Sequence, residues 1–333
     1  METKESIQIA VDTGAAFTKY AWLVGNEIAS IKASSFPTRI KKMGENSDFY
    51  NGIKIKYNGD FYDISEESPL RLSRETKKVG KEVYEICVYV AIAKALQEIG
   101  ADPQEVHPIE LSINIPVSDF KQQNVKSEYI AQYKGKKTII EVDGTEYTFA
   151  VEEVVPYFES QGVIMRTPEK FAQEVAFVFD LGGRNDTICK FRNLKPDGDS
   201  ALSGQQGLLS LLDSVAGALQ AQNDGDSINA NEVFKAKTGL RRGKLKGFEE
   251  QFAKATENYF QNIDNRLTVN GFRPADDLLV FTGGGAVLLK NELEAYFSKV
   301  VSSKDQLIVN ANDGWADNCK GALKRALIRR DAG

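Results

Sequence analysis

Histidine, cysteine and long hydrophobic runs are scarce in this chain, and each scarcity excludes a class of function. The single histidine, His107, stands before Pro108 in an expected loop, which argues against Ser-His-Asp or Cys-His catalysis and against a histidine-ligated metal. The cysteines are few and widely spaced, so we expect neither a disulfide framework nor a CxxC zinc site, and a reducing cytoplasm fits best. They are Cys87, Cys189 and Cys319.

An excess of positive charge is also missing. The 42 Lys and Arg residues are outnumbered by 47 Asp and Glu residues, which argues against direct binding of nucleic acid. Uncharged stretches reach about a dozen residues, well short of the roughly 20 that span a bilayer. Residues 1–6 lack the apolar region of a signal peptide, so we expect a cytoplasmic protein that does not contact a membrane.

The hydrophobic pattern alternates between strand and helix periods along the 333 residues. Alternation predicts strands at 7–11, 18–24 and near 27–33, and the Asn58-Gly59 and Asp143-Gly144 turns predict two further hairpins. A buried strand is expected at 110–115 and another at 278–281. Spacings of three and four predict helices at 81–99, 208–220, 229–237, 249–265, 287–300 and 315–330.

The opening pattern of strand, Asp, glycine turn and second strand returns at residues 175–188, which indicates an internal duplication. We therefore expect an α/β fold of two similar domains that share a cleft. The predicted domain boundaries are 1–158, with an inserted subdomain at about 35–74, then 159–310. Residues 311–333 form a C-terminal helix that returns to the first domain.

Three glycine turns follow predicted buried strands. Glycine allows a ligand to approach the backbone closely, and successive N–H groups in such turns bind anions. Each turn alone is weak, but the three in this order are specific, and neither a Walker A loop nor a GxGxxG turn after a strand is present. The turns are Asp12-Thr13-Gly14-Ala15-Ala16, followed by Lys19; Asp180-Leu181-Gly182-Gly183-Arg184-Asn185-Asp186; and Thr282-Gly283-Gly284-Gly285-Ala286.

These turns resemble the two phosphate loops and the adenosine loop of the actin-like ATPase superfamily, and the chain is most similar to ParM-type bacterial actins that segregate plasmids. Asp12, Gly14, Lys19 and Trp22 match the first loop, and Ile115-Pro116-Val117 resembles the family's L-P-V segment. The resemblance implies a ribonuclease H-like duplicated fold that binds ATP, or GTP, with Mg²⁺ and is left with ADP after slow hydrolysis. It also implies filaments of the protein itself and a DNA-binding adaptor of the ParR type.

The resemblance implies roles for individual residues. Asp12 and Asp180 would hold Mg²⁺, mainly through water, and Asp180 would also serve hydrolysis. Either Glu159 or Gln161 would orient the attacking water. Glu232 and Lys235 would lie beside the adenine and ribose, unless they form a solvated helix face. The residues expected to contact the nucleotide are Asp12, Thr13, Gly14, Ala15, Ala16, Lys19, Gly182, Gly183, Arg184, Asn185, Glu232, Lys235, Gly283, Gly284, Gly285 and Ala286.

The second turn departs from the family pattern, and other functions stay open. Arg184 would either reach the γ-phosphate or point outward, and Asp186 is a candidate replacement for a missing carboxylate. Ala15 and Ala16 leave only backbone contacts in the first turn. The alternatives are an MreB-like cytoskeletal actin, a small-molecule kinase with Asp119 as its base, and a nucleotide-binding scaffold without hydrolysis.

Overall fold

The computed structural model describes residues 5–23, 30–45, 47, 50–66, 78–197, 200–222, 227–241 and 243–331. The chain divides into two compact units, Met1–Thr167 with Ala316–Gly333, and Pro168–Trp315. The boundaries expected after residues 158 and 310 remain a prediction. Within the described residues, every helix is too short or too polar to cross a membrane.

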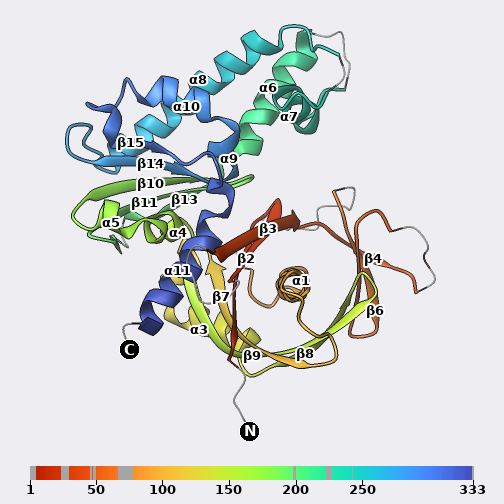
Figure 1. The fold of residues 1–333 in the computed structure, drawn as a ribbon. Coiled ribbons are helices and arrows are strands. Elements are labelled where there is room, and N and C mark those ends of the chain that lie inside the picture. The colour runs from red at the N-terminus through yellow and green to blue at the C-terminus, as the bar shows by residue number, and fades with distance from the viewer. Residues whose placement is uncertain are drawn as a thin grey trace. The chain divides into compact units, whose positions relative to one another are not determined.

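The first unit is a nine-stranded sheet that curves around helix α1 (Figure 1). Eleven of the residues in α1 are buried, as expected of a helix that contacts apolar groups on all sides. The strand order is β3-β2-β1-β7-β9-β8-β5-β6-β4. The strands are β1 Ile7–Thr13, β2 Phe17–Leu23, β3 Ile31–Pro37, β4 Ile40–Met43, β5 Ile53–Tyr57, β6 Asp60–Ile64, β7 Val106–Ile115, β8 Lys137–Val142 and β9 Thr145–Phe158, and the helices are α1 Glu82–Glu98, α2 Val117–Phe120, α3 Gln123–Tyr133, α4 Gln161–Arg166 and α11 Asp317–Asp331.

The two faces of this sheet bury different partners. Ile9 and Val11 of β1 join the core around α1, whereas Ala10 packs with Cys319 and Leu323 of α11. A β-bulge in β9 keeps its side chains aligned with those of β7 on the two faces. Ile109 pairs with Val151 and Glu110 pairs with Glu153, so the pairing passes over Glu152. After the bulge, Val154 lies in the α1 core and Tyr157 packs among the residues of α11.

The second unit repeats the central part of this sheet. In the first unit, β2 pairs antiparallel with β1, and β1-β7 and β7-β9 pair parallel. In the second unit, β11 pairs antiparallel with β10, and β10-β14 and β14-β15 pair parallel. The duplication expected from the sequence is therefore confirmed. Alternate β10 residues Phe177 and Phe179 join α6 and α8 in one core. The elements are β10 Val175–Leu181, β11 Asp186–Arg192, β12 Lys195–Pro196, β13 Leu202–Gly204, β14 Leu278–Thr282, β15 Leu307–Val309, α5 Pro168–Phe171, α6 Leu208–Gln222, α7 Ala230–Lys237, α8 Phe248–Val269, α9 Gly283–Leu288 and α10 Lys290–Phe297, with short 3₁₀ turns at Lys304–Gln306 and Gly314–Ala316.

Most of the predicted elements are confirmed, including α1, α6, α7, α8 and the two short hairpins. Asn58 and Gly59 have φ angles of 51° and 82°, and Asp143 and Gly144 have 52° and 83°, as a type I′ turn requires. The predicted inserted segment contributes β4, β5 and β6 to the sheet, through the pairing of β5 with β8. The junction between the strands expected at 18–24 and near 27–33 lies outside the described residues.

Three predictions of local structure are wrong. His107 lies in β7 and not in a loop; it is 6% exposed and its Nε2 lies 2.8 Å from the Asp102 carbonyl oxygen. Pro108 is tolerated there because β7 pairs with β1 only from Ile109 onward. The helix expected at 287–300 is two helices that meet at Leu289, whose backbone is not helical. The third strand runs from Ile31 to Pro37, because β2 offers it partners as far as Phe17.

Candidate functional site

The first glycine turn closes the β1–β2 hairpin of the first unit. The Gly14 N–H donates to the Asp12 carbonyl oxygen at 3.0 Å, and a Cβ at Gly14 would lie 2.7 Å from the Phe17 carbonyl oxygen. Only glycine fits such a close approach without a shift of the backbone. The N–H groups of Ala15 and Ala16 make no backbone hydrogen bond to the described part of the chain, so they remain available to an anion.

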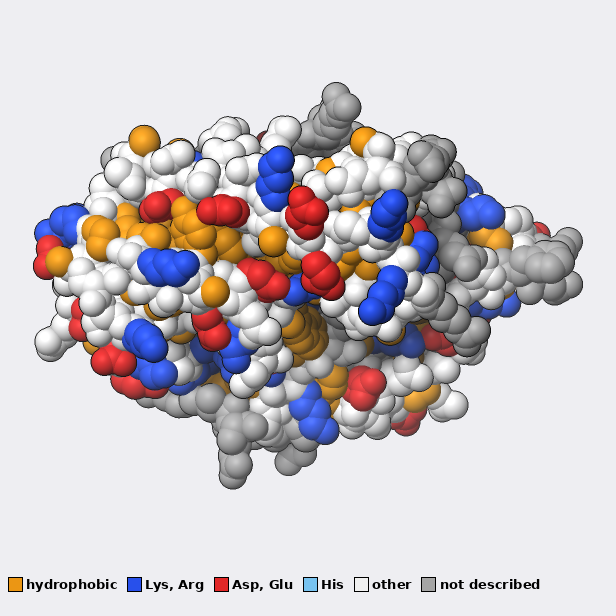
Figure 2. Space-filling view, turned by 90° about the horizontal axis from the view of Figure 1, so that it is seen from above, with side chains coloured by type: hydrophobic (Ala, Val, Ile, Leu, Met, Phe, Trp, Pro, Cys, Tyr) orange, Lys and Arg blue, Asp and Glu red, His pale blue; other side chains and the backbone are white. Residues whose placement is uncertain are grey.

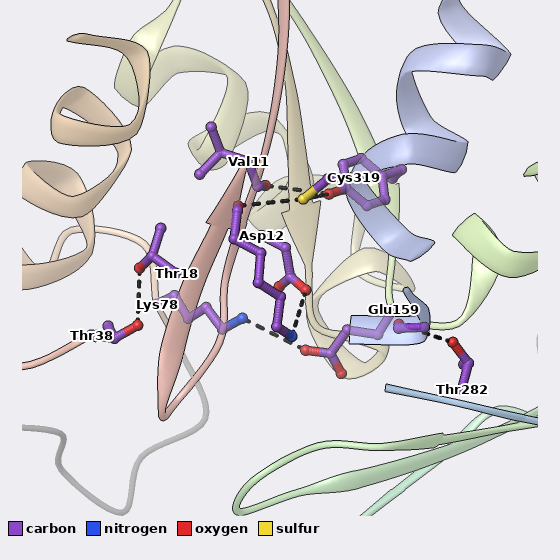
Figure 3. A network of polar contacts seen from close by, with 11 residues as sticks. Val11, Asp12, Thr18, Thr38, Lys78, Glu159, Thr282 and Cys319 are labelled. Atoms are coloured by element: carbon purple, nitrogen blue, oxygen red, sulfur yellow. Dashed lines mark hydrogen bonds and ion pairs between the residues drawn. The ribbon is translucent and has the colours of Figure 1, made fainter. Parts of the chain in front are cut away.

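Two ion pairs lie at the ends of β1 and β9. Lys19 Nζ is 3.3 Å from Asp12 Oδ2, and Lys78 Nζ is 3.6 Å from Glu159 Oε1. Figure 3 shows the Asp12, Lys78 and Glu159 side chains directed toward one region. Lys78 was not expected from the sequence, because it precedes α1 by a few residues and belongs to no motif. Two ammonium groups in a largely buried setting suit a polyanionic ligand.

Lys78 is tied to a second buried group through Tyr129. The Lys78 N–H donates to the Tyr129 hydroxyl at 3.2 Å, and that hydroxyl donates to Asp119 Oδ2 at 2.9 Å. Burial, and then the Asp119 charge, raise the pKa of Tyr129. The Asp119 carboxylate, considered as a kinase base, is thus 5% exposed and held by a tyrosine.

The two candidates for orienting water differ in their surroundings. Gln161 begins α4, is 8% exposed, and its Oε1 accepts a hydrogen bond from Arg325 Nη1 at 3.0 Å. The Glu159 side chain is 21% exposed. Between them Ser160 is fully buried in a left-handed conformation with φ 74°, which turns the chain sharply after β9. Both groups are therefore engaged, Gln161 with Arg325 and Glu159 with Lys78, and Glu159 is the more exposed of the two.

Tyr157 and Cys319 fix the end of β1 from the α11 side. The Tyr157 hydroxyl donates to the Val11 carbonyl oxygen at 3.3 Å, and the Cys319 thiol donates to the Lys19 carbonyl oxygen at 3.3 Å. Burial raises the pKa of both the Tyr157 hydroxyl and the Cys319 thiol, so both stay protonated donors. Nothing in the sequence pattern pointed to this support.

The second glycine turn repeats the first within the other unit. A Cβ at Gly182 would lie 2.5 Å from the Asn185 carbonyl oxygen, which is the same three-residue offset as Gly14 and Phe17. The Gly182 and Gly183 carbonyl oxygens accept hydrogen bonds from the first N–H groups of α6, at 2.9 and 2.8 Å. Asp180, at the end of β10, is 9% exposed. The turn is thus anchored to α6 with a carboxylate at its start.

The third glycine turn packs directly on the second. Asp180 pairs with Thr282 across β10 and β14. Gly283 has φ 88°, and a Cβ there would meet the Asp180 carboxylate and would lie 2.7 Å from the Leu181 carbonyl oxygen. The turn starts α9, and Gly283, Gly285 and Ala286 are buried. The structure therefore brings the second and third turns together, and convergence of the first turn with them stays a prediction.

Asp186 and Arg184, at the end of the second glycine turn, differ in the contacts of their side chains. The Asp186 carboxylate is buried and forms an ion pair with Arg266 of α8, whose guanidinium lies 5.2 Å from the Phe179 ring centre. This contact speaks against Asp186 as a replacement catalytic carboxylate. The Arg184 side chain makes no hydrogen bond or ion pair with another described residue, so both readings of Arg184 stay open.

The expected adenosine-side residues lie on α7, which Asn229 caps. Glu232 accepts a hydrogen bond from Arg241 Nε at 2.9 Å and lies 3.7 Å from Lys235 Nζ. The Arg241 hydrogen bond is the main cause of the lowered pKa of Glu232. Both side chains are partly exposed, and their contact with a nucleotide remains a prediction. Arg241 belongs to a short run of basic residues, of which Arg242 lies outside the described residues.

Metal binding would depend on few protein ligands. Among the described residues, no three His, Cys, Asp or Glu side chains gather as a metal-binding group. Asp12 and Asp180 each supply a carboxylate beside a glycine turn, and carboxylate oxygen is the donor type that Mg²⁺ prefers. The donor chemistry fits Mg²⁺ held largely through water, and the assignment remains a prediction.

Comparisons with known proteins agree on one architecture. Residues 10–162 match the family described as "Actin like proteins N terminal domain". The structure is similar to the archaeal actin homologue Ta0583, with a TM-score of 0.77, 16% identity and coverage of 97% of this chain and 99% of that one. Apo psk41 ParM has a TM-score of 0.73 and 16% identity, with coverage of 98% of each chain. Bacillus thuringiensis ParM with ATP has a TM-score of 0.71 and 12% identity, with coverage of 99% of this chain and 100% of that one. No curated protein sequence matches the chain.

The chain therefore has the α/β two-domain fold of the actin-like superfamily, as expected from the sequence. Residues 10–162 are similar to the N-terminal domain of actin-like proteins, and the similarity to ParM-type proteins is confirmed. Identities of 12 to 20% to the solved structures show the fold alone.

Proposed function

We propose that the chain binds ATP with Mg²⁺, hydrolyses it slowly, assembles into filaments of itself and moves plasmid DNA through a DNA-binding adaptor of the ParR type. The observation that carries the proposal is the repeated glycine hairpin after Asp12 and after Asp180, the second of which packs against the turn at Gly283. Relatives of the same fold include ParM with ATP, Ta0583 in complex with ADP, and an Alp12 filament. GTP is an alternative nucleotide.

In this proposal, backbone N–H groups and a positively charged side chain bind the phosphates. The N–H groups of Ala15 and Ala16 donate to phosphate oxygens, and Lys19 supplies a positive charge. Lys19 exchanges part of its contact with Asp12 for the phosphates. Asp12 and Asp180 would hold Mg²⁺ through water, and the bound ion would supply positive charge beside the phosphates.

Glu159 is the proposed group that orients the attacking water, because its carboxylate is more exposed than the Gln161 amide. Phosphate-release assays on Glu159→Ala and Gln161→Ala test this choice. We expect Glu159→Ala to lose about 10²- to 10⁴-fold in turnover while fluorescent-nucleotide binding is kept. The reverse pattern, with loss of turnover only in Gln161→Ala, would transfer the role.

Assembly is tested separately from hydrolysis. Head-to-tail contacts between copies that do not close into a ring produce filaments. Light scattering and negative-stain microscopy with Mg-ATP, with a non-hydrolysable analogue and with ADP should show polymer that depends on the triphosphate. Asp12→Ala should remove it, whereas Asp213→Ala, an exposed position on α6, should not. Absence of polymer at every protein concentration and with every nucleotide would reject the filament.

The adaptor is proposed from the resemblance to ParM-type proteins, and the charge of the chain is consistent with it. On the face drawn in Figure 2, Lys and Arg side chains are interspersed with Asp and Glu side chains. The net charge is −5, which favours contact with DNA through a second protein. A mobility-shift assay should show no DNA binding by the chain alone and binding once a basic adaptor is added. Salt-sensitive DNA binding by the chain alone would contradict this part of the proposal.

A further inference from the structure

The buried lysine Lys78 has no part in the mechanism proposed above. The residue is 9% exposed, and lysine is rarely buried unless its ammonium group is paired. Its Nζ lies 3.6 Å from Glu159 Oε1 and 6.0 Å from the centre of the Tyr84 ring, which is the outer limit of a cation–π contact. Figure 3 shows the Lys78 side chain extended toward the Glu159 carboxylate. Among the described residues, Glu159 is thus the carboxylate that pairs with this ammonium group.

The main chain around Lys78 is fixed by helix α3, although Lys78 itself precedes α1. The Lys78 N–H donates to the Tyr129 hydroxyl at 3.2 Å, and the Gly80 N–H donates to Gln132 Oε1 at 3.1 Å. The Tyr129 hydroxyl in turn donates to Asp119 Oδ2 at 2.9 Å, and both of these side chains are buried. A buried polar network of this kind rigidifies the segments that it joins. The base of the Lys78 side chain is therefore held in place.

The contact with Lys78 restrains the part of Glu159 that its own main chain leaves free. Glu159 directly follows β9, and the next residue, Ser160, is fully buried with φ 74°, so the main chain is fixed on both sides. The side chain has several rotatable bonds, and ordering it costs conformational entropy. A carboxylate offers about four lone-pair sites. Glu159 can therefore accept from Lys78 and from a water molecule at the same time.

The two lysines of this region differ in the carboxylates that they contact. Lys19 Nζ lies 3.3 Å from Asp12, at the start of the first glycine turn, whereas Lys78 Nζ pairs with Glu159. Lys19 thus accompanies the groups proposed to bind phosphate, and Lys78 accompanies the group proposed to orient water. Such a group needs support from its neighbours, because a displacement of about 1 Å can cost roughly 100-fold in rate.

We propose that Lys78 is a positioning residue, whose ammonium group holds the Glu159 carboxylate in the orientation that directs the attacking water. Tyr129, supported by Asp119, holds the main chain from which the Lys78 side chain extends. This inference rests on the proposed role of Glu159 in hydrolysis. It assigns no phosphate contact to Lys78.

Steady-state phosphate release with Mg-ATP tests the role of Lys78. Lys78→Met keeps the hydrocarbon chain and removes the charge, and we expect kcat to fall about 10- to 100-fold with an unchanged KM for ATP. Lys78→Arg restores a cation at this position and should recover most of kcat. Lys94→Met is the matched control, because it breaks another lysine–carboxylate ion pair in the same unit, with Asp143, and should keep the turnover of the wild type.

A double-mutant cycle separates positioning from a direct effect on the nucleotide. In a Glu159→Ala background, Lys78→Met should cause no further loss of kcat, because the group that it positions is gone. Urea unfolding of the nucleotide-free protein provides a second readout. Lys78→Met should lower the unfolding midpoint in the wild-type background and should lower it less in the Glu159→Ala background, which measures the ion pair without any hydrolysis.

The outcomes that overturn this inference differ from those that overturn the role of Glu159. Unchanged kcat in Lys78→Met, or an equal loss in Lys94→Met, would overturn the positioning role. A raised KM with equal losses of kcat in both backgrounds would also overturn it, since Lys78 would then contact the nucleotide itself. Full turnover in Glu159→Ala would instead overturn the role proposed for Glu159, and a wild type that hydrolyses no ATP would overturn both.

Discussion

Replacement of Gly283 by alanine should destabilise the second unit by about 1–5 kcal/mol and should disturb Asp180. At φ 88° a side chain costs about 1–2 kcal/mol. The new Cβ would also lie 2.7 Å from the Leu181 carbonyl oxygen and would meet the Asp180 carboxylate, and such overpacking adds about 1–3 kcal/mol. Alanine also lowers the conformational entropy of the unfolded chain, which offsets about 0.4–1 kcal/mol of the lost free energy of unfolding.

Gly284→Ala is the matched control, because a Cβ at Gly284 has open space around it and lies in α9. It should be neutral or stabilising by up to about 1 kcal/mol. Urea unfolding in a Trp22→Phe background leaves Trp315 of the second unit as the fluorescent reporter. Equal midpoints for Gly283→Ala and Gly284→Ala would refute the contact between the second and third turns. Nucleotide binding should weaken only in Gly283→Ala if Asp180 serves as proposed.

Three further perturbations test the buried polar groups. Arg266→Met leaves the Asp186 carboxylate buried without its cation and should cost about 3–5 kcal/mol of unfolding free energy, and a loss below about 1 kcal/mol would contradict the ion pair. Tyr157→Phe removes the donor to the Val11 carbonyl oxygen and should cost about 1 kcal/mol in urea unfolding; no change would show that the 3.3 Å contact contributes nothing. Burial raises the pKa of the Cys87 thiol from 9.0 to about 12, so its contribution to stability is complete below pH 9 and declines as pH rises toward 12. Midpoints measured from pH 7 to 11 should fall less steeply in Cys87→Ala, and parallel curves would refute this cause.

Local signals were sufficient where neighbouring residues determine the conformation. The Asn58-Gly59 and Asp143-Gly144 turns formed as predicted because only residues that tolerate positive φ fit them. The turns at Gly14 and Gly182 need glycine for a different local reason, since a Cβ at either position would meet the carbonyl oxygen three residues later. Periodicity was a weaker guide at residues 287–300, where the helix breaks at Leu289.

Contacts between distant parts of the chain were invisible to the sequence analysis. Lys78 and Glu159 meet although 81 residues separate them, and no spacing rule connects them. His107 was assigned to a loop because Pro108 follows it, and only the pairing of β7 shows that a proline is tolerated there. Asp186 was read as a catalytic candidate from its place after the turn, yet Arg266 of α8 holds its carboxylate.

The sequence by itself determined the strand-turn-strand hairpins, the duplication and the resemblance to actin-like proteins, because turns and periodicity depend on residues only a few positions apart. The tertiary structure decided which charges meet and which face of the sheet each side chain occupies. A single extra residue in β9, Glu152, exchanges the two faces, placing Val154 in the core around α1 and Glu153 on the opposite face of the sheet. Register depends on the pairing of whole strands, and no local window of the sequence contains it.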